Sequence, residues 1–199
     1  MRQLTLPLPG LDRDWRQDAA LRPQPKRNGP DDWTTPPCLC AALAHDVLPV
    51  VPDGPVWEPA PGSGALVEAI AAAGRHAIAP AGLDFLACPV PKEARILATN
   101  PPFHLHAAFI ARSMMLLDTG QLEAVVLLFR HDHLQSESRT PPRCRIAALN
   151  RASQVFICPW RPVWIAGTSG NGRWSNAWVL WLRGAEPRPP VWLKRRTAR

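Results

Sequence analysis

The sequence has no tyrosine, few cysteines and no long hydrophobic run, and each shortage excludes a class of protein. Its five cysteines form an odd, scattered set, which argues against a secreted domain held by disulfides, so we expect reduced thiols. No apolar stretch approaches the roughly 20 residues of a membrane-spanning helix. The first residues also lack the basic-then-apolar pattern of a signal peptide. We therefore expect a soluble, cytoplasmic protein with no membrane partner.

Proline and positive charge are abundant instead. The chain of 199 residues has 24 prolines and a formal net charge of +7. The prolines punctuate loops and leave the apolar runs free, as expected for ordered elements joined by turns. A hydrophobic content of 46% supports one sizeable core, and the length is too short for two ordinary domains. The positive charge is compatible with a polyanionic partner.

Two regions differ in composition. Residues 1–30 are polar, proline-rich and without apolar periodicity, so we predict a flexible N-terminal tail followed by one domain, residues 31–199. Residues 3–8 resemble the short peptides with which bacterial DNA-handling proteins bind the replication sliding clamp, and an unstructured leader is the alternative reading.

From residue 31 onward, short apolar runs alternate with helical stretches. This alternation is typical of an α/β fold, in which a mostly parallel sheet carries helices on both faces. The predicted strands are Pro55–Pro59, Arg75–Ala79, Arg95–Thr99, Glu123–Phe129, Gln154–Ile157 and Asn176–Leu182, and the predicted helices are Pro36–Ala44, Ala65–Ala73 and Leu105–Leu117.

A glycine turn follows the first predicted strand. Glu58 ends the strand, and Gly62 and Gly64 precede the next helix. The glycines permit positive φ angles and a close approach by a ligand, and the helix start offers free N–H groups. A dinucleotide fingerprint would have a third glycine where this chain has Val67, which argues against that ligand. An ordinary strand-to-helix turn is the alternative.

A second unusual segment, Asn100-Pro101-Pro102-Phe103, follows the strand predicted at Arg95–Thr99. Two successive prolines fix φ and remove two backbone donors, so the segment cannot extend the sheet. Its carbonyl groups remain free to accept hydrogen bonds. Together with the Asn100 side chain they form a rigid acceptor pair for an amino group, and a simple proline turn is the alternative.

These segments resemble motifs I (E/D-P-x-x-G-x-G) and IV (N/D-P-P-Y/F) of the Rossmann-like S-adenosylmethionine-dependent methyltransferases that act on amino nitrogens. Asp32-Trp33-Thr34-Thr35-Pro36-Pro37 and Leu83-Asp84-Phe85-Leu86 resemble motifs X and III. The order X, I, III, IV is similar to that of phage and prophage DNA adenine-N6 methyltransferases. The resemblance covers residues 31–103 and implies a single Rossmann-like domain that uses S-adenosyl-L-methionine in a bacterial or phage-infected cell.

The resemblance also implies roles for individual residues. Asn100 and the Pro101 carbonyl would orient the target amino group toward the sulfonium methyl, and Phe103 would stack on a target base flipped out of the duplex. The implied catalytic residues are Asn100, Pro101, Pro102 and Phe103. The implied cofactor-binding residues are Trp33, Thr35, Glu58, Pro59, Ala60, Gly62, Gly64, Asp84, Phe85 and Asn100.

One departure from the family pattern concerns the cofactor ribose. The family usually has an acidic residue at the end of the second strand, and residues 77–82 contain none. The ribose is then held by Glu58, Asp84 or backbone groups, or cofactor affinity is weak, or activity has been lost. Asp84 itself is read equally well as a solvated loop carboxylate.

DNA is the expected partner. The candidate phosphate contacts are Arg130, Arg139, Arg143 and Arg145, which are also what a solvated basic loop would contain. The histidines at 104, 106, 131 and 133 lack a carboxylate cluster and the chemistry needs no metal, so we expect none. Methylation of RNA adenine or of a protein glutamine, and a non-catalytic DNA-binding accessory role, remain alternatives.

Overall fold

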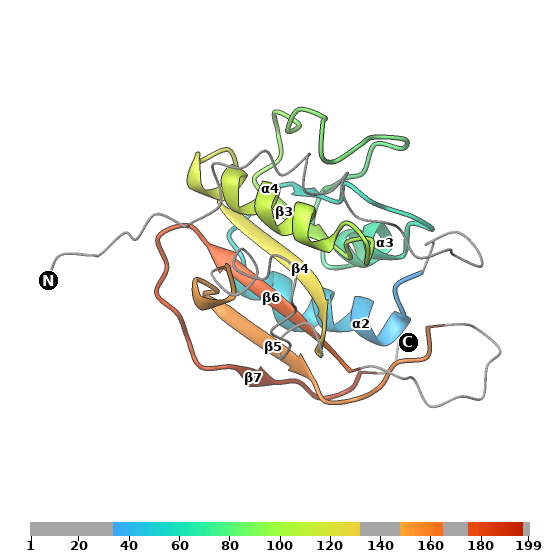
Figure 1. Ribbon diagram of the computed structural model, residues 1–199. Coiled ribbons are helices and arrows are strands. Elements are labelled where there is room, and N and C mark those ends of the chain that lie inside the picture. The colour runs from blue at the N-terminus through green and yellow to red at the C-terminus, as the bar shows by residue number, and fades with distance from the viewer. Residues whose placement is uncertain (1–33, 132–147, 165–174, 197–199) are drawn as a thin grey trace, which may run out of the picture.

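The computed structural model describes residues 34–131, 148–164 and 175–196, which form one mixed sheet with helices on both faces (Figure 1). The strands are β1 (Val56–Trp57), β2 (Ala77–Ile78), β3 (Ile96–Thr99), β4 (Ala124–Arg130), β5 (Gln154–Cys158), β6 (Asn176–Leu182) and β7 (Val191–Trp192). The helices are α2 (Pro37–Ala42), the π-helical turn η1 (Leu43–Val47), the 3-10 turn η2 (Leu48–Val50), α3 (Ala65–Ala72) and α4 (His106–Asp118).

The sheet is mostly parallel, as the sequence predicts. The strand order is β2-β1-β3-β4-β6-β5-β7, and only β6 runs antiparallel to its neighbours β4 and β5. Strands β1 to β4 are parallel to one another, so the loops that follow them leave from the same edge. Ligands in open α/β sheets bind at this carboxyl edge.

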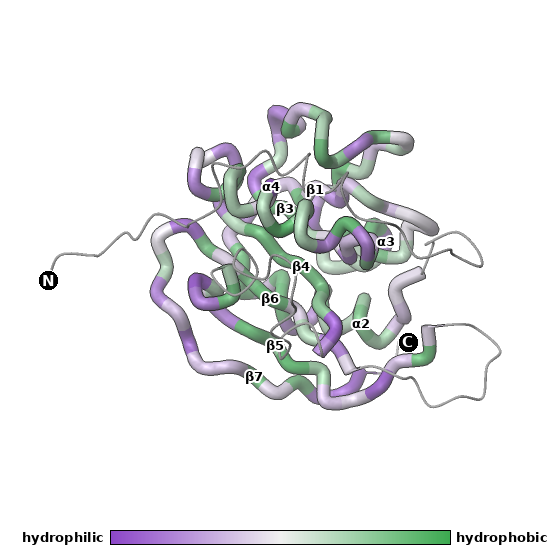
Figure 2. Tube along the Cα trace, in the orientation of Figure 1, coloured by the Kyte–Doolittle hydropathy of each residue, from purple (hydrophilic) through white to green (hydrophobic). Residues whose placement is uncertain are grey.

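Strand β4 lies at the centre and contributes to a core on each face. Val126 and Leu128 pack in the cluster that includes α2, η1 and α3, whereas Val125 and Leu127 pack in the cluster that includes α4. A strand covered on both faces must be apolar throughout, and Figure 2 shows this continuous hydrophobic stretch.

Two tryptophans of β6 anchor segments on opposite faces of the sheet. The buried indole of Trp178 donates to the Leu39 carbonyl in α2 at 3.1 Å, and the buried indole of Trp181 donates to the Ala148 carbonyl at 2.6 Å. Both side chains are therefore core residues.

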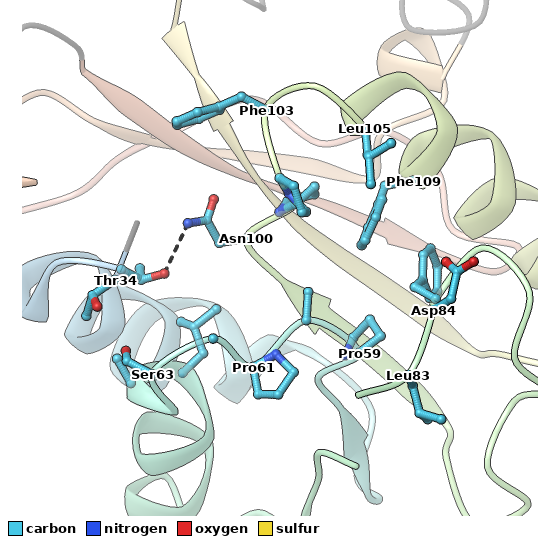
Figure 3. Close-up of a pocket in the computed structure, with 18 of the residues that line it drawn as sticks. Thr34, Pro59, Pro61, Ser63, Leu83, Asp84, Asn100, Phe103, Leu105 and Phe109 are labelled. Carbon is cyan, nitrogen blue, oxygen red and sulfur yellow. Dashed lines mark hydrogen bonds between the residues drawn. The ribbon is translucent and has the colours of Figure 1, made fainter. Parts of the chain in front are cut away.

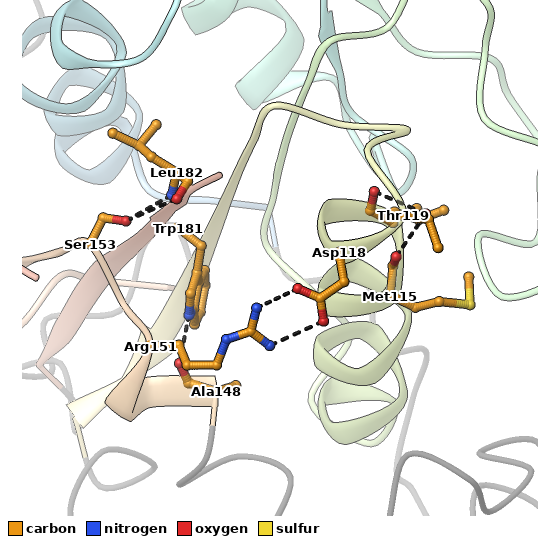
Figure 4. Close-up of polar contacts among 9 residues, drawn as sticks. Met115, Asp118, Thr119, Ala148, Arg151, Ser153, Trp181 and Leu182 are labelled. Atoms are coloured by element: carbon orange, nitrogen blue, oxygen red, sulfur yellow. Dashed lines mark hydrogen bonds and ion pairs between the residues drawn. The ribbon is translucent and has the colours of Figure 1, made fainter. Parts of the chain in front are cut away.

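Residues 148–153 are tied to their neighbours by further polar contacts (Figure 4). Asp118, at the end of α4, forms an ion pair with Arg151. The Leu182 N–H in β6 donates to the Ser153 hydroxyl at 2.8 Å. These contacts fix the chain just before β5 and connect it to the end of α4.

The structure differs from the predicted elements in two places. The helix predicted at Pro36–Ala44 continues through η1 and η2 to Val50, because the apolar residues Val47 and Leu48 remain buried in the core. Strand β7 was not predicted, since it contains two residues and follows a proline-rich stretch.

The predicted tail, residues 1–30, and its clamp-like segment, residues 3–8, lie outside the described residues. Within the described residues, no helix has the length and apolarity needed to cross a bilayer.

Candidate active site

A cavity of about 510 Å³ opens at the carboxyl edge, between the loops that follow β1, β2 and β3 (Figure 3). Its volume falls within the roughly 300–1,000 Å³ of ordinary ligand pockets. The predicted site residues that line it are Thr35, Pro59, Ala60, Gly62, Asp84, Phe85, Asn100, Pro101, Pro102 and Phe103. The structure therefore brings the predicted cofactor loop and the predicted catalytic loop to one cavity.

The glycine turn forms the wall next to α3. Gly62 and Gly64 have φ angles of 51° and 87°, in the left-handed region that favours glycine. A Cβ on Gly64 would meet no atom within 4 Å, so this position requires glycine for its backbone conformation rather than for space. Ala65 and Leu66 of α3 also line the cavity. The N–H groups of this first turn have no acceptor within the helix, which makes the wall a donor surface.

Glu58 supports this loop from behind. Its side chain is fully buried and does not line the cavity, and its Oε1 accepts a hydrogen bond from the Ala60 N–H at 2.9 Å. Burial raises the pKa of Glu58 to about 8, although the neighbouring Thr99 hydroxyl and the Ala60 N–H favour the ionised form. Among the described residues, neither Glu58 Oε2 nor Thr99 Oγ1 makes a hydrogen bond of ordinary geometry, so the Thr99 hydroxyl favours the ionised form only as a nearby dipole.

Asp84 and Phe85 lie on the loop after β2. The exposed Asp84 carboxylate accepts the Leu86 N–H at 2.9 Å, so it shapes its own turn while facing the cavity. The Phe85 ring is 2% exposed and packs against Trp57 and Phe109, with ring centroids at 5.4 and 4.5 Å. Of the cavity-lining residues that the structure describes, Asp84 alone carries a carboxylate.

The Asn100 side chain is oriented by a residue far away in the sequence. Its Nδ2 donates to Thr35 Oγ1 at 3.2 Å, drawn as a dashed line in Figure 3, which leaves Oδ1 as an acceptor. The Pro102 carbonyl accepts the Leu105 N–H at 2.9 Å. No backbone N–H of the described residues donates to the Pro101 carbonyl. Asn100 Oδ1 and the Pro101 carbonyl are thus two acceptors on the same loop.

Phe103 is held by side chains from two other strand ends. Trp164, after β5, meets the Phe103 ring edge-on with ring centroids 6.2 Å apart. The Arg130 guanidinium, at the end of β4, lies 5.5 Å from the centre of the same ring. Phe103 is half-buried and lines the cavity, so part of the ring remains accessible.

Several lining residues were not predicted. Ser63 and Leu83 lie within the motif segments, and Leu105 and Phe109 follow the Asn-Pro-Pro-Phe segment, but nothing in their pattern separates a lining residue from a core residue. Phe109 illustrates this, because α4 buries most of its residues and only the packing decides which of them meet the cavity.

Other predicted residues cannot be placed at this site. Gly64 shapes the turn without lining the cavity. The cofactor candidate Trp33 and the phosphate candidates Arg139, Arg143 and Arg145 lie outside the described residues, as does residue 133. No group of three or more His, Cys, Asp or Glu side chains that could hold a metal occurs among the described residues.

Comparisons with known proteins agree on the fold. No family model and no curated protein sequence matches the chain. Among solved structures, a protein of Listeria monocytogenes assigned to class I of the S-adenosylmethionine-dependent methyltransferases aligns with a TM-score of 0.55 and 8% identity, over 83% of this chain and 67% of that one. The type IIG restriction endonuclease BpuSI aligns with a TM-score of 0.54 and 12% identity, over 80% of this chain.

The type I restriction-modification methyltransferase subunit from Streptococcus thermophilus aligns with a TM-score of 0.51 and 14% identity, over 77% of this chain. The chain spans 26% of BpuSI and 45% of the Streptococcus subunit. At these identities the likeness concerns the fold alone. The chain has the Rossmann-like α/β fold of these solved structures.

Proposed function

We propose that the protein is an S-adenosylmethionine-dependent N-methyltransferase that acts on adenine N6 in DNA. One observation carries this proposal. Asn100 and Pro101, which offer two acceptors for an amino group, line the same cavity as the left-handed glycine turn before α3. A methyltransferase needs these two features side by side, because the methyl group must pass directly from one ligand to the other.

The cavity offers complementary groups for each part of the cofactor. The free N–H groups at the start of α3 suit the carboxylate of its methionine part. Asp84 suits a ribose hydroxyl or the adenine amino group, and it compensates for the absent acid at the end of β2. Leu83, an exposed side chain, provides apolar surface for a planar ring, and the buried Phe85 backs this wall of the cavity. The cofactor supplies a methyl group activated by a positively charged sulfur.

The chain's own residues orient the target nitrogen. An adenine amino group is a poor nucleophile because its lone pair is delocalised into the ring. Hydrogen bonds donated to Asn100 Oδ1 and to the Pro101 carbonyl turn the lone pair out of the ring plane. With the methyl donor bound, the nitrogen held in this way would take the methyl group as the carbon–sulfur bond broke, S-adenosylhomocysteine would leave, and the amino group would lose one proton to water. The two acceptors also stabilise the positive charge that develops on nitrogen.

Basic residues support a nucleic-acid target. Strands β4, β5 and β7 run in the same direction, so the segments that follow them leave from the edge that holds the cavity. Arg130 ends β4, Arg161 follows β5, and Lys194 and Arg195 follow β7. Except for the half-buried Arg130 these side chains are exposed. These side chains suit the phosphates of DNA, and Phe103, which lines the cavity, would stack on a flipped base.

Transfer of a labelled methyl group tests the proposal. The pure protein is incubated with methyl-labelled S-adenosylmethionine and one substrate at a time. The three substrates are DNA lacking prior methylation, RNA and protein. We expect label in DNA as N6-methyladenine. Asn100→Ala should lower the rate by about 10²-fold, the scale of losing one preorganised hydrogen bond in a transition state. Thr119→Val serves as the control, because Thr119 does not line the cavity.

Three outcomes would redirect the assignment. Label in RNA or in protein glutamine keeps the reaction but replaces the substrate. A protein that binds DNA without binding S-adenosylmethionine in a calorimetric titration is a non-catalytic accessory protein, which the missing acid at the end of β2 favours. Equal transfer by Asn100→Ala and the wild type contradicts the role given to the Asn-Pro-Pro-Phe segment.

A further inference from the structure

A hydrogen bond joins the segment before α2 to the catalytic loop. Thr35 and Asn100 are 65 positions apart, and Asn100 Nδ2 donates to Thr35 Oγ1 at 3.2 Å. The Thr35 side chain is 6% exposed and Asn100 is half-buried, so water competes little for this contact. The motif resemblance implied a cofactor role for Thr35, whereas this contact joins Thr35 to the catalytic loop.

The orientation of the Asn100 amide decides whether the loop can accept an amino group. An asparagine amide has an acceptor at one end and a donor at the other. With Nδ2 directed at Thr35, Oδ1 is left to accept from the target. In the opposite orientation, the NH2 group of Asn100 would point at the target amino group. Two hydrogen-bond donors cannot bond each other.

We propose that Thr35 is a positioning residue for methyl transfer. Its hydroxyl oxygen accepts a hydrogen bond from Asn100 Nδ2 while Asn100 Oδ1 binds the target amino group. This inference rests on the proposed function. In the free protein the hydroxyl can donate or accept, so either amide orientation is satisfied. Once Oδ1 accepts from the target, Nδ2 needs an acceptor on its other side. Thr35 Oγ1 is the group placed to provide it.

Thr35 is itself held firmly. Its carbonyl accepts from the Cys40 thiol at 3.4 Å, and the Leu39 N–H donates to the Pro36 carbonyl at 2.9 Å as α2 begins. The Trp178 indole from β6 then binds the Leu39 carbonyl. This series of contacts connects the centre of the sheet to the Asn100 amide, which gives the preorganisation that an orienting hydrogen bond requires.

The test compares Thr35→Val, Thr35→Ser and the control Thr119→Val with the wild type. Unmethylated DNA is the substrate in steady-state assays, and S-adenosylhomocysteine is the probe for cofactor affinity by calorimetry. In Thr35→Val we expect kcat to fall about ten-fold, the effect of one unsatisfied hydrogen bond, with the affinity for S-adenosylhomocysteine unchanged. Thr35→Ser, which keeps the hydroxyl, should recover most of kcat.

A second readout does not depend on turnover. In NMR spectra, the side-chain NH2 signals of Asn100 are those that disappear in Asn100→Asp. The protons that give these signals should exchange with solvent faster in Thr35→Val than in Thr35→Ser. An unchanged kcat in Thr35→Val overturns the inference and leaves the proposed function intact. Loss of S-adenosylhomocysteine affinity in proportion to kcat, without recovery by Thr35→Ser, also overturns it and makes Thr35 a cofactor ligand. A wild type that neither binds the cofactor nor methylates overturns the proposed function instead.

Discussion

Replacing Glu58 with glutamine should stabilise the protein near neutral pH. The Glu58 side chain is fully buried, and burial raises its pKa from 4.5 to about 8. In the unfolded chain the carboxyl group ionises above its ordinary pKa, while the folded protein keeps it protonated until the pH approaches 8. The unfolded state therefore loses its proton first, and the free energy of unfolding of the wild type falls as the pH rises between these values.

The size of the effect follows from the same values. Each pKa unit corresponds to about 1.4 kcal/mol. The contribution of Glu58 to the free energy of unfolding should therefore fall by about 3 kcal/mol between pH 4 and pH 7, and by about 5 kcal/mol once the pH exceeds 8. Glutamine has nearly the shape of a protonated glutamate and retains an oxygen for the Ala60 N–H. Glu58→Gln should match the wild type at pH 4 and exceed its stability by about 3 kcal/mol at pH 7.

Urea unfolding of both proteins at intervals between pH 4 and pH 9 measures this difference. Subtracting the two curves cancels the titration of every other group, because all other residues are shared. A difference in unfolding free energy that stays constant from pH 5 to pH 8 would refute the reasoning, since it would mean that the Glu58 carboxyl titrates equally in both states. A difference of opposite sign would mean that the folded protein prefers the ionised carboxylate.

Two further changes test the walls of the cavity. Gly64→Ala should destabilise the protein by about 1–2 kcal/mol in urea unfolding, because alanine is strained at a φ of 87° although space is available; an unchanged midpoint would contradict this. Asp84→Asn keeps an oxygen for the Leu86 N–H and so preserves the turn, but should weaken S-adenosylmethionine binding about ten-fold in calorimetry through loss of a charged hydrogen bond. Unaltered affinity would make Asp84 only a turn residue.

The sequence predicted best those parts whose residue types restrict the backbone locally. The glycine turn and the Asn-Pro-Pro segment were recognisable because Gly64 needs a left-handed conformation and successive prolines exclude a strand. Strand β4 was recognisable because a strand covered on both faces is continuously apolar. In each case the information lies within a few neighbouring residues.

The contacts that complete the site depend on packing between distant segments. The hydrogen bond from Asn100 to Thr35 and the edge-on contact of Trp164 with Phe103 each join residues more than 60 positions apart. Nothing in the local pattern of either partner indicates the other. The burial of Glu58 could not be predicted for the same reason. Only the folded structure shows that this carboxyl group lies behind the loop rather than in the cavity.

The two outermost strands carry a consequence for self-association. Both β2 and β7 contain only two residues. The chain approaches β7 through prolines at positions 187, 189 and 190, which have no N–H to offer a neighbouring molecule. Short edge strands of this kind offer a second molecule few backbone hydrogen bonds with which to extend the sheet. Within the described residues, the sheet thus ends on both sides in strands that offer a second molecule little backbone for pairing.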